Sequence, residues 1–166
     1  MGILFSAGDI FEIAIEIERN GAGFYRKAAS QTSDTTARQE LLELAAMEDD
    51  HEVTFTQLKR DLIGDDKTVE WYDAEDEAVL YLQNFAAGQV FDITKNPAEW
   101  LTPETTLKQV IEFAMQRERD SVLFFVGMKN LVPTGRGSVK IEAIIKQEMW
   151  HIALLSKRRM ELSPRA

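Results

Sequence analysis

The sequence predicts an all-α protein, a four-helix bundle made of two helical hairpins joined by a long crossover. Three observations support this prediction. Apolar residues recur at helical spacing over four long stretches, short polar turns join those stretches in pairs, and the two pairs repeat each other at an offset of 100 residues. The 166 residues fit a single domain, 1–166, with a core large enough to be stable alone.

The composition excludes several classes of protein. The chain has no cysteine, which excludes disulfides, zinc–thiolate sites and iron–sulfur clusters within it. A net charge of −9 argues against nucleic acid or an anionic membrane as the main partner, because both attract basic patches. The first residues have no basic region and too short an apolar run for a signal peptide or membrane span. We therefore expect a cytoplasmic protein that binds neither nucleic acid nor membranes.

The first hairpin is expected to comprise helices over about 9–31 and 34–63. Asp9 and Glu12 have the spacing of a capping box at the start of the first helix. A polar cluster at 31–36 forms the turn, and Gly64 follows the last apolar position, where a helix commonly ends.

Residues 64–102 are expected to form the crossover between helices 2 and 3, with one short helix over about 73–87. Helical hairpins need only about 2–8 linking residues, so a connection of this length implies that the chain crosses the length of the bundle. The segment is rich in aromatic residues, which we expect to pack against the bundle or a dimer partner. These residues are Trp71, Tyr72, Tyr81, Phe85, Phe91 and Trp100.

The second hairpin is expected to comprise helices over about 103–131 and 138–161. Thr102 followed by Pro103 is typical of an N-cap with proline in the first helical position. Pro133 and two glycines then mark the turn, and the last helix is expected to begin near Ser138.

The repeat places acidic and imidazole side chains on apolar helix faces. The segment AIEIERNGAGFY at 14–25 aligns with AMQRERDSVLFF at 114–125, which matches Glu18 to Glu118. At the same offset, a Glu-x-x-His pair on each hairpin's second helix matches its counterpart, and residues three apart share a helix face. The pairs are Glu48 with His51 and Glu148 with His151. One such pair is common on helix surfaces, but a doubled pair on buried faces indicates a site, because a buried carboxylate is costly without a partner.

The spacing predicts that these side chains meet. Glu18 and Glu48 are centred on the first turn, and Glu118 and Glu148 on the second. At 1.5 Å per helical residue, all four lie about 20 Å from their own turn, and hence at one height in the bundle. Four carboxylates and two imidazoles in a bundle core are the donor set of a carboxylate-bridged dinuclear metal site. Without thiolates, this set suits iron or manganese better than structural zinc.

The doubled motif Glu-x-x-(Gly/Ser)-x-x-Phe-(Tyr/Phe), followed by Glu-x-x-His, resembles the ferritin-like superfamily, specifically its rubrerythrin-like di-iron carboxylate proteins. The resemblance covers essentially the whole chain outside the crossover. It implies a ferritin-like four-helix bundle that binds two iron ions, with manganese as the alternative. It also implies six metal ligands that act catalytically through the metal: Glu18, Glu48, His51, Glu118, Glu148 and His151.

Two features differ from rubrerythrins. Those proteins carry a rubredoxin-like domain with four cysteines, which is absent here, and a further Glu three residues after the third-helix ligand, where this chain has Ser121. The implied function is a non-haem di-iron oxidoreductase of peroxidase or ferroxidase type that oxidises ferrous iron or reduces peroxide or dioxygen. We expect a homodimer and an external electron donor, such as a rubredoxin-like protein.

The sequence is compatible with three other functions. They are an iron-storage subunit similar to ferritin or bacterioferritin, a di-iron hydroxylase with an organic substrate, and a metal-stabilised scaffold. A large native mass would favour storage, and an open pocket beside the metals would favour a hydroxylase. Tyr25, seven residues after Glu18 on the same face, is interpreted as a core residue whose hydroxyl is satisfied locally. The alternative is a hydrogen bond to a metal ligand or the relay of an electron.

Overall fold

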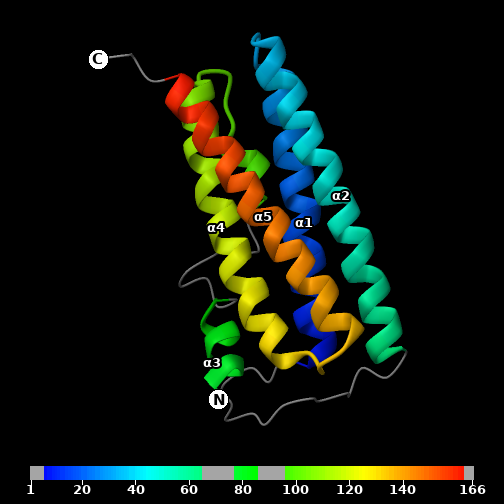
Figure 1. The fold of residues 1–166 in the computed structure, drawn as a ribbon. Helices are drawn as coiled ribbons and strands as arrows, with labels where there is room; N and C mark the ends of the chain where they lie inside the picture. The colour runs from blue at the N-terminus through cyan, green and yellow to red at the C-terminus, as the bar shows by residue number, and fades with distance from the viewer. Residues whose placement is uncertain (1–5, 65–76, 86–95, 163–166) are drawn as a thin grey trace.

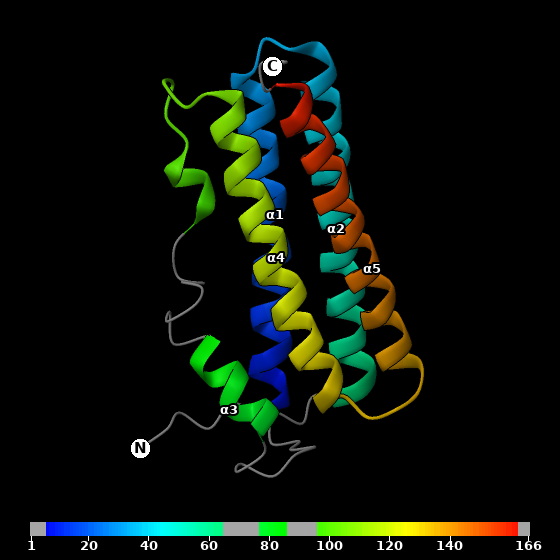
Figure 2. The same cartoon turned by 60° about the vertical axis from the view of Figure 1, so that its left-hand side comes forward.

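The computed structural model describes residues 6–64, 77–85 and 96–162. Its elements are helices α1 (Ala7–Gln31), α2 (Thr35–Ile63), α3 (Glu77–Asn84), α4 (Leu107–Leu131) and α5 (Arg136–Glu161), with a short 3-10 helix, η2 (Pro97–Trp100). No strand occurs among these residues. Helices α1 and α2 pack along each other, as do α4 and α5, and the two hairpins form a four-helix bundle (Figures 1 and 2). The predicted fold class is confirmed.

Helices α1 and α4 are capped by other residues than the sequence suggested. Ser6 is the N-cap of α1, and Asp9 is the third residue of the helix (N3) in the capping box. The backbone N–H of Ser6 donates a hydrogen bond to Asp9 Oδ2 at 2.8 Å. The third long helix starts at Leu107 instead of 103. Thr106 caps it in a second capping box, completed by the side chain of Gln109.

Two of the expected glycines lie at helix ends, one where the crossover begins and one in the second hairpin turn. Gly64 ends α2 with φ of +60°, a conformation that side chains with a Cβ rarely adopt. Gly135, with φ of +143°, precedes α5, which therefore begins two residues earlier than the expected Ser138.

The described parts of the crossover pack against the bundle. Helix α3 covers α4, and η2 lies against α1 on the same side of the molecule (Figure 2). The ring of Trp100 stacks on Phe113 with centroids 4.3 Å apart, and the buried Phe85 contacts Phe124. The short helix was expected over 73–87; it spans Glu77–Asn84, and residues 73–76, 86 and 87 lie outside the described residues, as do Trp71, Tyr72 and Phe91.

The apolar core is divided into two clusters along the bundle. One contains Phe11, Phe55, Phe125 and Ile141, and the other contains Leu41, Leu44, Ile111 and Leu155. On every long helix the expected metal ligands fall between the residues of one cluster and those of the other. The fold therefore encloses a polar layer between two apolar ones.

Within the described ranges, none of the helices is both long and apolar enough to cross a membrane.

Candidate metal centre

All six residues expected to bind metal lie in the polar layer, one or two from each long helix. Their side chains point into the bundle and are almost completely buried. The exposed fractions are 0% for Glu18, 4% for Glu48, 3% for His51, 4% for Glu118, 1% for Glu148 and 0% for His151. Burial of four carboxylates in one layer is unfavourable unless cations or protons accompany them.

The six side chains divide into two overlapping sets of four. In each set, one donor atom per residue lies within 4.8 Å of all the others. The first set holds Glu18 and His51, the second holds Glu118 and His151, and both contain Glu48 and Glu148. Two carboxylates are therefore placed to bridge two metal positions, and each position has its own terminal carboxylate and imidazole.

Both imidazoles present the same nitrogen to the carboxylates. His51 Nδ1 lies 2.7 Å from Glu148 Oε1 and 3.2 Å from Glu18 Oε2. His151 Nδ1 lies 3.2 Å from Glu48 Oε1 and 3.4 Å from Glu118 Oε2. The two rings are stacked, with centroids 5.8 Å apart. Nδ1 is thus the nitrogen placed to bind a metal, and Nε2 faces away from the centre.

Several buried oxygen and nitrogen atoms of these side chains have no hydrogen-bond partner within the described residues. They are Glu18 Oε1, Glu48 Oε1, Glu148 Oε1 and both ring nitrogens of His151. The short contacts of His151 Nδ1 lack hydrogen-bond geometry. Buried polar atoms are rarely left unpaired, and carboxylate and imidazole donors are suited to divalent iron or manganese. The donor set therefore fits two metal ions.

The terminal carboxylates favour the protonated form in the metal-free protein. Burial raises the pKa of Glu18 well above its usual value, and the negative charges of Glu48 and Glu148 add to the effect. Burial, together with the charge of Glu148, raises the pKa of Glu118 to about 8.

The pKa values of the two shared carboxylates are lowered and those of the two histidines are raised, as expected for ion pairs. Burial acts to raise the pKa of Glu48, but the close approach of Glu18 and the two histidines outweighs it and lowers this pKa. The pKa of Glu148 is lowered for the same reason, with Glu118 as the neighbouring acid. Burial disfavours charged imidazole, yet the surrounding carboxylates raise the pKa of His151 to about 12 and also raise that of His51. Without metal, the cluster is thus close to neutral at pH 7, with two carboxylates facing two imidazoliums.

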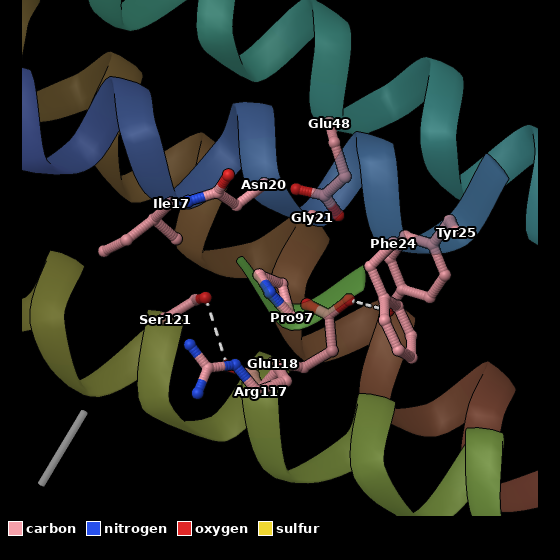
Figure 3. A pocket seen from close by; sticks show the side chains of 10 residues that line it. All are labelled: Ile17, Asn20, Gly21, Phe24, Tyr25, Glu48, Pro97, Arg117, Glu118 and Ser121. Carbon is pink, nitrogen blue, oxygen red and sulfur yellow. Dashed lines mark hydrogen bonds between the residues drawn. The ribbon is translucent and has the colours of Figure 1, made fainter. Parts of the chain in front are cut away.

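Tyr25 contacts the centre directly. It is buried on α1, and its hydroxyl donates a hydrogen bond to Glu118 Oε1 on α4 (Figure 3). Tyr25 is a core residue, as interpreted from the sequence. The expected local partner of its hydroxyl was wrong, because the acceptor lies 93 residues away in sequence. The repeat counterpart of Tyr25 is Phe125, so only one half of the site has this hydroxyl.

A cavity between α1 and α4 reaches the centre. It encloses about 390 Å³, including space open to solvent, and Glu48 and Glu118 form its inner wall (Figure 3). Gly21 on α1 and Ser121 on α4, the matched small residues of the repeat, both line it, as does Pro97 of η2. The crossover therefore contributes to the opening.

Sequence reasoning assigned no role to Gln147, which contacts the centre from α5. Its Oε1 lies 2.6 Å from His51 Nε2, on the side of the ring away from the carboxylates. No pattern in the sequence marks this glutamine, since amides are frequent on exposed helix faces. Only its position next to Glu148 could have suggested the contact.

The solved structures include one with a similar fold. A ferritin-like diiron-carboxylate protein from Thermotoga maritima superposes with a TM-score of 0.69 over 95% of this chain and 97% of its own, at 21% sequence identity. No protein-family model matches the chain, and no curated protein matches it in sequence.

Proposed function

Starting from a ferritin-like fold with a buried carboxylate and histidine cluster, we propose that this protein is a non-haem di-iron oxidoreductase of rubrerythrin type. The observation that supports this most strongly is the division of six buried ligands into two sets that share Glu48 and Glu148. A single metal ion would need only one of the two sets, and a structural zinc site would typically use Cys and His.

The charge of the cluster also suits two divalent ions. Four ionised carboxylates carry four negative charges, which two divalent cations neutralise, so the loaded centre can remain buried. When bound, two irons supply two electrons between their diferrous and diferric states, the number needed to reduce one hydrogen peroxide to two waters. Iron is proposed over manganese because of the resemblance to rubrerythrins.

The chain's own residues would bind, orient and shield that centre. Glu48 and Glu148 would bind at both positions, while Glu18 and Glu118 would each complete one of them. Tyr25 fixes the orientation of the Glu118 carboxylate through its hydrogen bond. The apolar clusters on either side exclude water, so access is proposed to run through the cavity between α1 and α4.

The cavity supports one alternative, a hydroxylase acting on an organic substrate. It borders Glu48 and Glu118, as a substrate site beside the metals would. Its 390 Å³, however, includes space open to solvent, and the room inside it for water-sized molecules is only about 30 Å³, enough for roughly one or two waters. This size favours peroxide, dioxygen or ferrous iron, and limits a hydroxylase to a small substrate.

Turnover is proposed to need a separate electron donor, such as a rubredoxin-like protein, because the chain has no cysteine to hold a redox centre of that kind. We further propose a homodimer located in the cytoplasm. The native mass tests whether the protein is a dimer, and the cellular fraction that contains the protein tests its location.

The function is tested by anaerobic loading with ferrous iron, followed by separate exposure to peroxide and to oxygen. We expect about two irons per chain, consumption of about one peroxide per site, and then no further reaction until a reductant is added. Uptake of many irons by a large particle would instead indicate storage. Oxidation of an added organic compound would indicate a hydroxylase, and metal binding without any redox reaction would indicate a scaffold.

A further inference from the structure

The two halves of the metal centre differ in what holds the outer nitrogen of each histidine. His51 Nε2 lies 2.6 Å from the side-chain oxygen of Gln147. His151 Nε2 is buried and has no hydrogen-bond partner in the part of the chain that the structure describes. The residue that corresponds to Gln147 in the first repeat is Met47, whose thioether is only a weak acceptor.

This difference matters for metal binding because of the imidazole tautomer. A neutral imidazole that binds metal through Nδ1 must carry its hydrogen on Nε2. The amide oxygen of Gln147 accepts that hydrogen and so holds the ring of His51 in the tautomer and orientation that expose the Nδ1 lone pair. The reverse amide orientation would donate to Nε2 and force the hydrogen onto Nδ1, which a bound metal forbids. His151 has no such acceptor and must bind metal without this support.

We propose that Gln147 is a positioning residue that makes the two metal positions unequal, so that the position of Glu18 and His51 fills first and holds its ion more tightly. This proposal rests on the proposed di-metal site. Partners of this kind typically change metal affinity by about 10- to 100-fold, and the two positions share the same bridging carboxylates. A difference in metal affinity between the two positions is therefore expected to come from residues that contact the ligands, such as Gln147, and not from the ligands themselves.

The chain is well suited to a direct test. It contains only two histidines, so the imidazole spectrum of ¹⁵N-labelled protein has one set of ring signals for each position. Gln147 is exposed on the outer side of α5, and its substitution leaves the apolar clusters intact. Tyr25 contacts Glu118 in the other half, so it is kept unchanged in every variant.

The experiment titrates metal-free protein with Zn²⁺ and follows both imidazole rings by NMR, with a His51→Asn spectrum used for assignment. In the unsubstituted protein, His51 should shift with the first equivalent and His151 with the second. Gln147→Met, which gives both halves the same residue, should lower the affinity of the first step by about 10-fold and make the rings shift together. Gln147→Glu, which retains an acceptor oxygen, should preserve the order.

The first repeat provides the matched controls. Met47→Gln adds an acceptor where His151 has none and should bring the Zn²⁺ affinity of the second binding step closer to that of the first. Met47→Leu adds no acceptor and should leave both affinities unchanged. Rings that shift together in the unsubstituted protein, or an unchanged order in Gln147→Met, would overturn the inequality while leaving the metal site in place. The absence of a shift in both rings would overturn the metal site and the proposal with it.

Discussion

Gly21 on α1 lies directly against the carboxylate of Glu48 on α2. A Cβ at Gly21 would stand 3.4 Å from Glu48 Cγ and 3.5 Å from its Oε2, which is ordinary van der Waals contact. An alanine therefore fits this position, but its methyl group would occupy part of the cavity wall beside a bridging carboxylate.

Gly21→Ala is accordingly expected to affect stability and activity in opposite directions. Replacing glycine within a helix stabilises it by roughly 0.5–1 kcal/mol, while a narrower cavity should slow the reaction of the iron-loaded protein with peroxide. Gly23→Ala is the matched control, because a Cβ there has no neighbour within 4 Å. Urea unfolding should show a similar gain for both variants, and stopped-flow absorbance should show slowing only for Gly21→Ala. Equal rates in the two variants would exclude access beside Gly21.

Loss of the Tyr25 hydroxyl should destabilise the metal-free protein. Tyr25→Phe leaves Glu118 Oε1 without its donor inside the bundle, and an unpaired buried acceptor costs about 1–3 kcal/mol. Tyr81→Phe removes a hydroxyl that donates to the Leu123 carbonyl oxygen from a partly exposed position, and should cost less. The free energies of unfolding of the two variants test this, and equal losses would contradict it.

The stability of the metal-free protein should fall as pH rises from about 5 to 8. An unfolded glutamate loses its proton near pH 4.3, whereas folded Glu118 keeps its proton to about pH 8 and Glu18 has a raised pKa too. The folded state therefore binds more protons than the unfolded state over this range, and stability decreases with pH. The raised pKa values of the histidines act in the same direction above about pH 6.5.

Acid below about pH 4 should destabilise the fold again, because Glu48 and Glu148 have lowered pKa values and their contribution is lost on protonation. Metal reverses the trend at higher pH, since protons compete with metal for the same ligands. Thermal melts of metal-free and loaded protein should therefore diverge as pH rises from 5 to 8. Parallel curves would argue against a buried ligand cluster.

Metal binding at pH 7 should release about four protons per centre. Glu18, Glu118 and both histidines favour the protonated form without metal, and each must lose one proton to bind an ion. Calorimetry in buffers of different ionisation enthalpy measures this number. At pH 9, above the pKa of Glu118 at about 8, the number should fall by about one. Release of no protons at either pH would contradict the assigned protonation states.

Bridging and terminal carboxylates should differ in how they affect metal content. Glu18→Gln removes a ligand from one set only, so about one ion per chain should remain, whereas Glu48→Gln removes a ligand from both sets and should weaken both positions. Glu16→Gln, an exposed neighbour on α1 that pairs with Arg19, serves as the control with full content. Elemental analysis after dialysis decides the matter, and equal losses in the first two variants would contradict the bridging assignment.

The fold and the convergence of the six polar residues were predictable from the sequence because both depend on spacing alone. Helical periodicity defines the faces, and equal distances from the two turns place Glu18, Glu48, Glu118 and Glu148 at one height. A buried carboxylate also stands out in an apolar stripe, since it is unfavourable there without a partner.

Features that depend on competition between neighbouring residues were not predictable in the same way. Thr102 with Pro103 and Thr106 with Gln109 both have the pattern of a helix start. The second is the one used, because its two side chains satisfy each other's backbone N–H groups. The contact of Gln147 with His51 depends on how closely α5 approaches α2, a distance that helical periodicity does not determine.

The offset of 100 residues has a consequence for how such a centre can diversify. A single helical hairpin that paired with a second copy of itself would build the same centre from identical halves, and every substitution would then appear twice. Tandem duplication of the hairpin within one gene removes that constraint, because each copy can mutate alone. Tyr25 in place of Phe125, Gly21 in place of Ser121 and Gln147 in place of Met47 are differences that two identical copies of one hairpin could not carry.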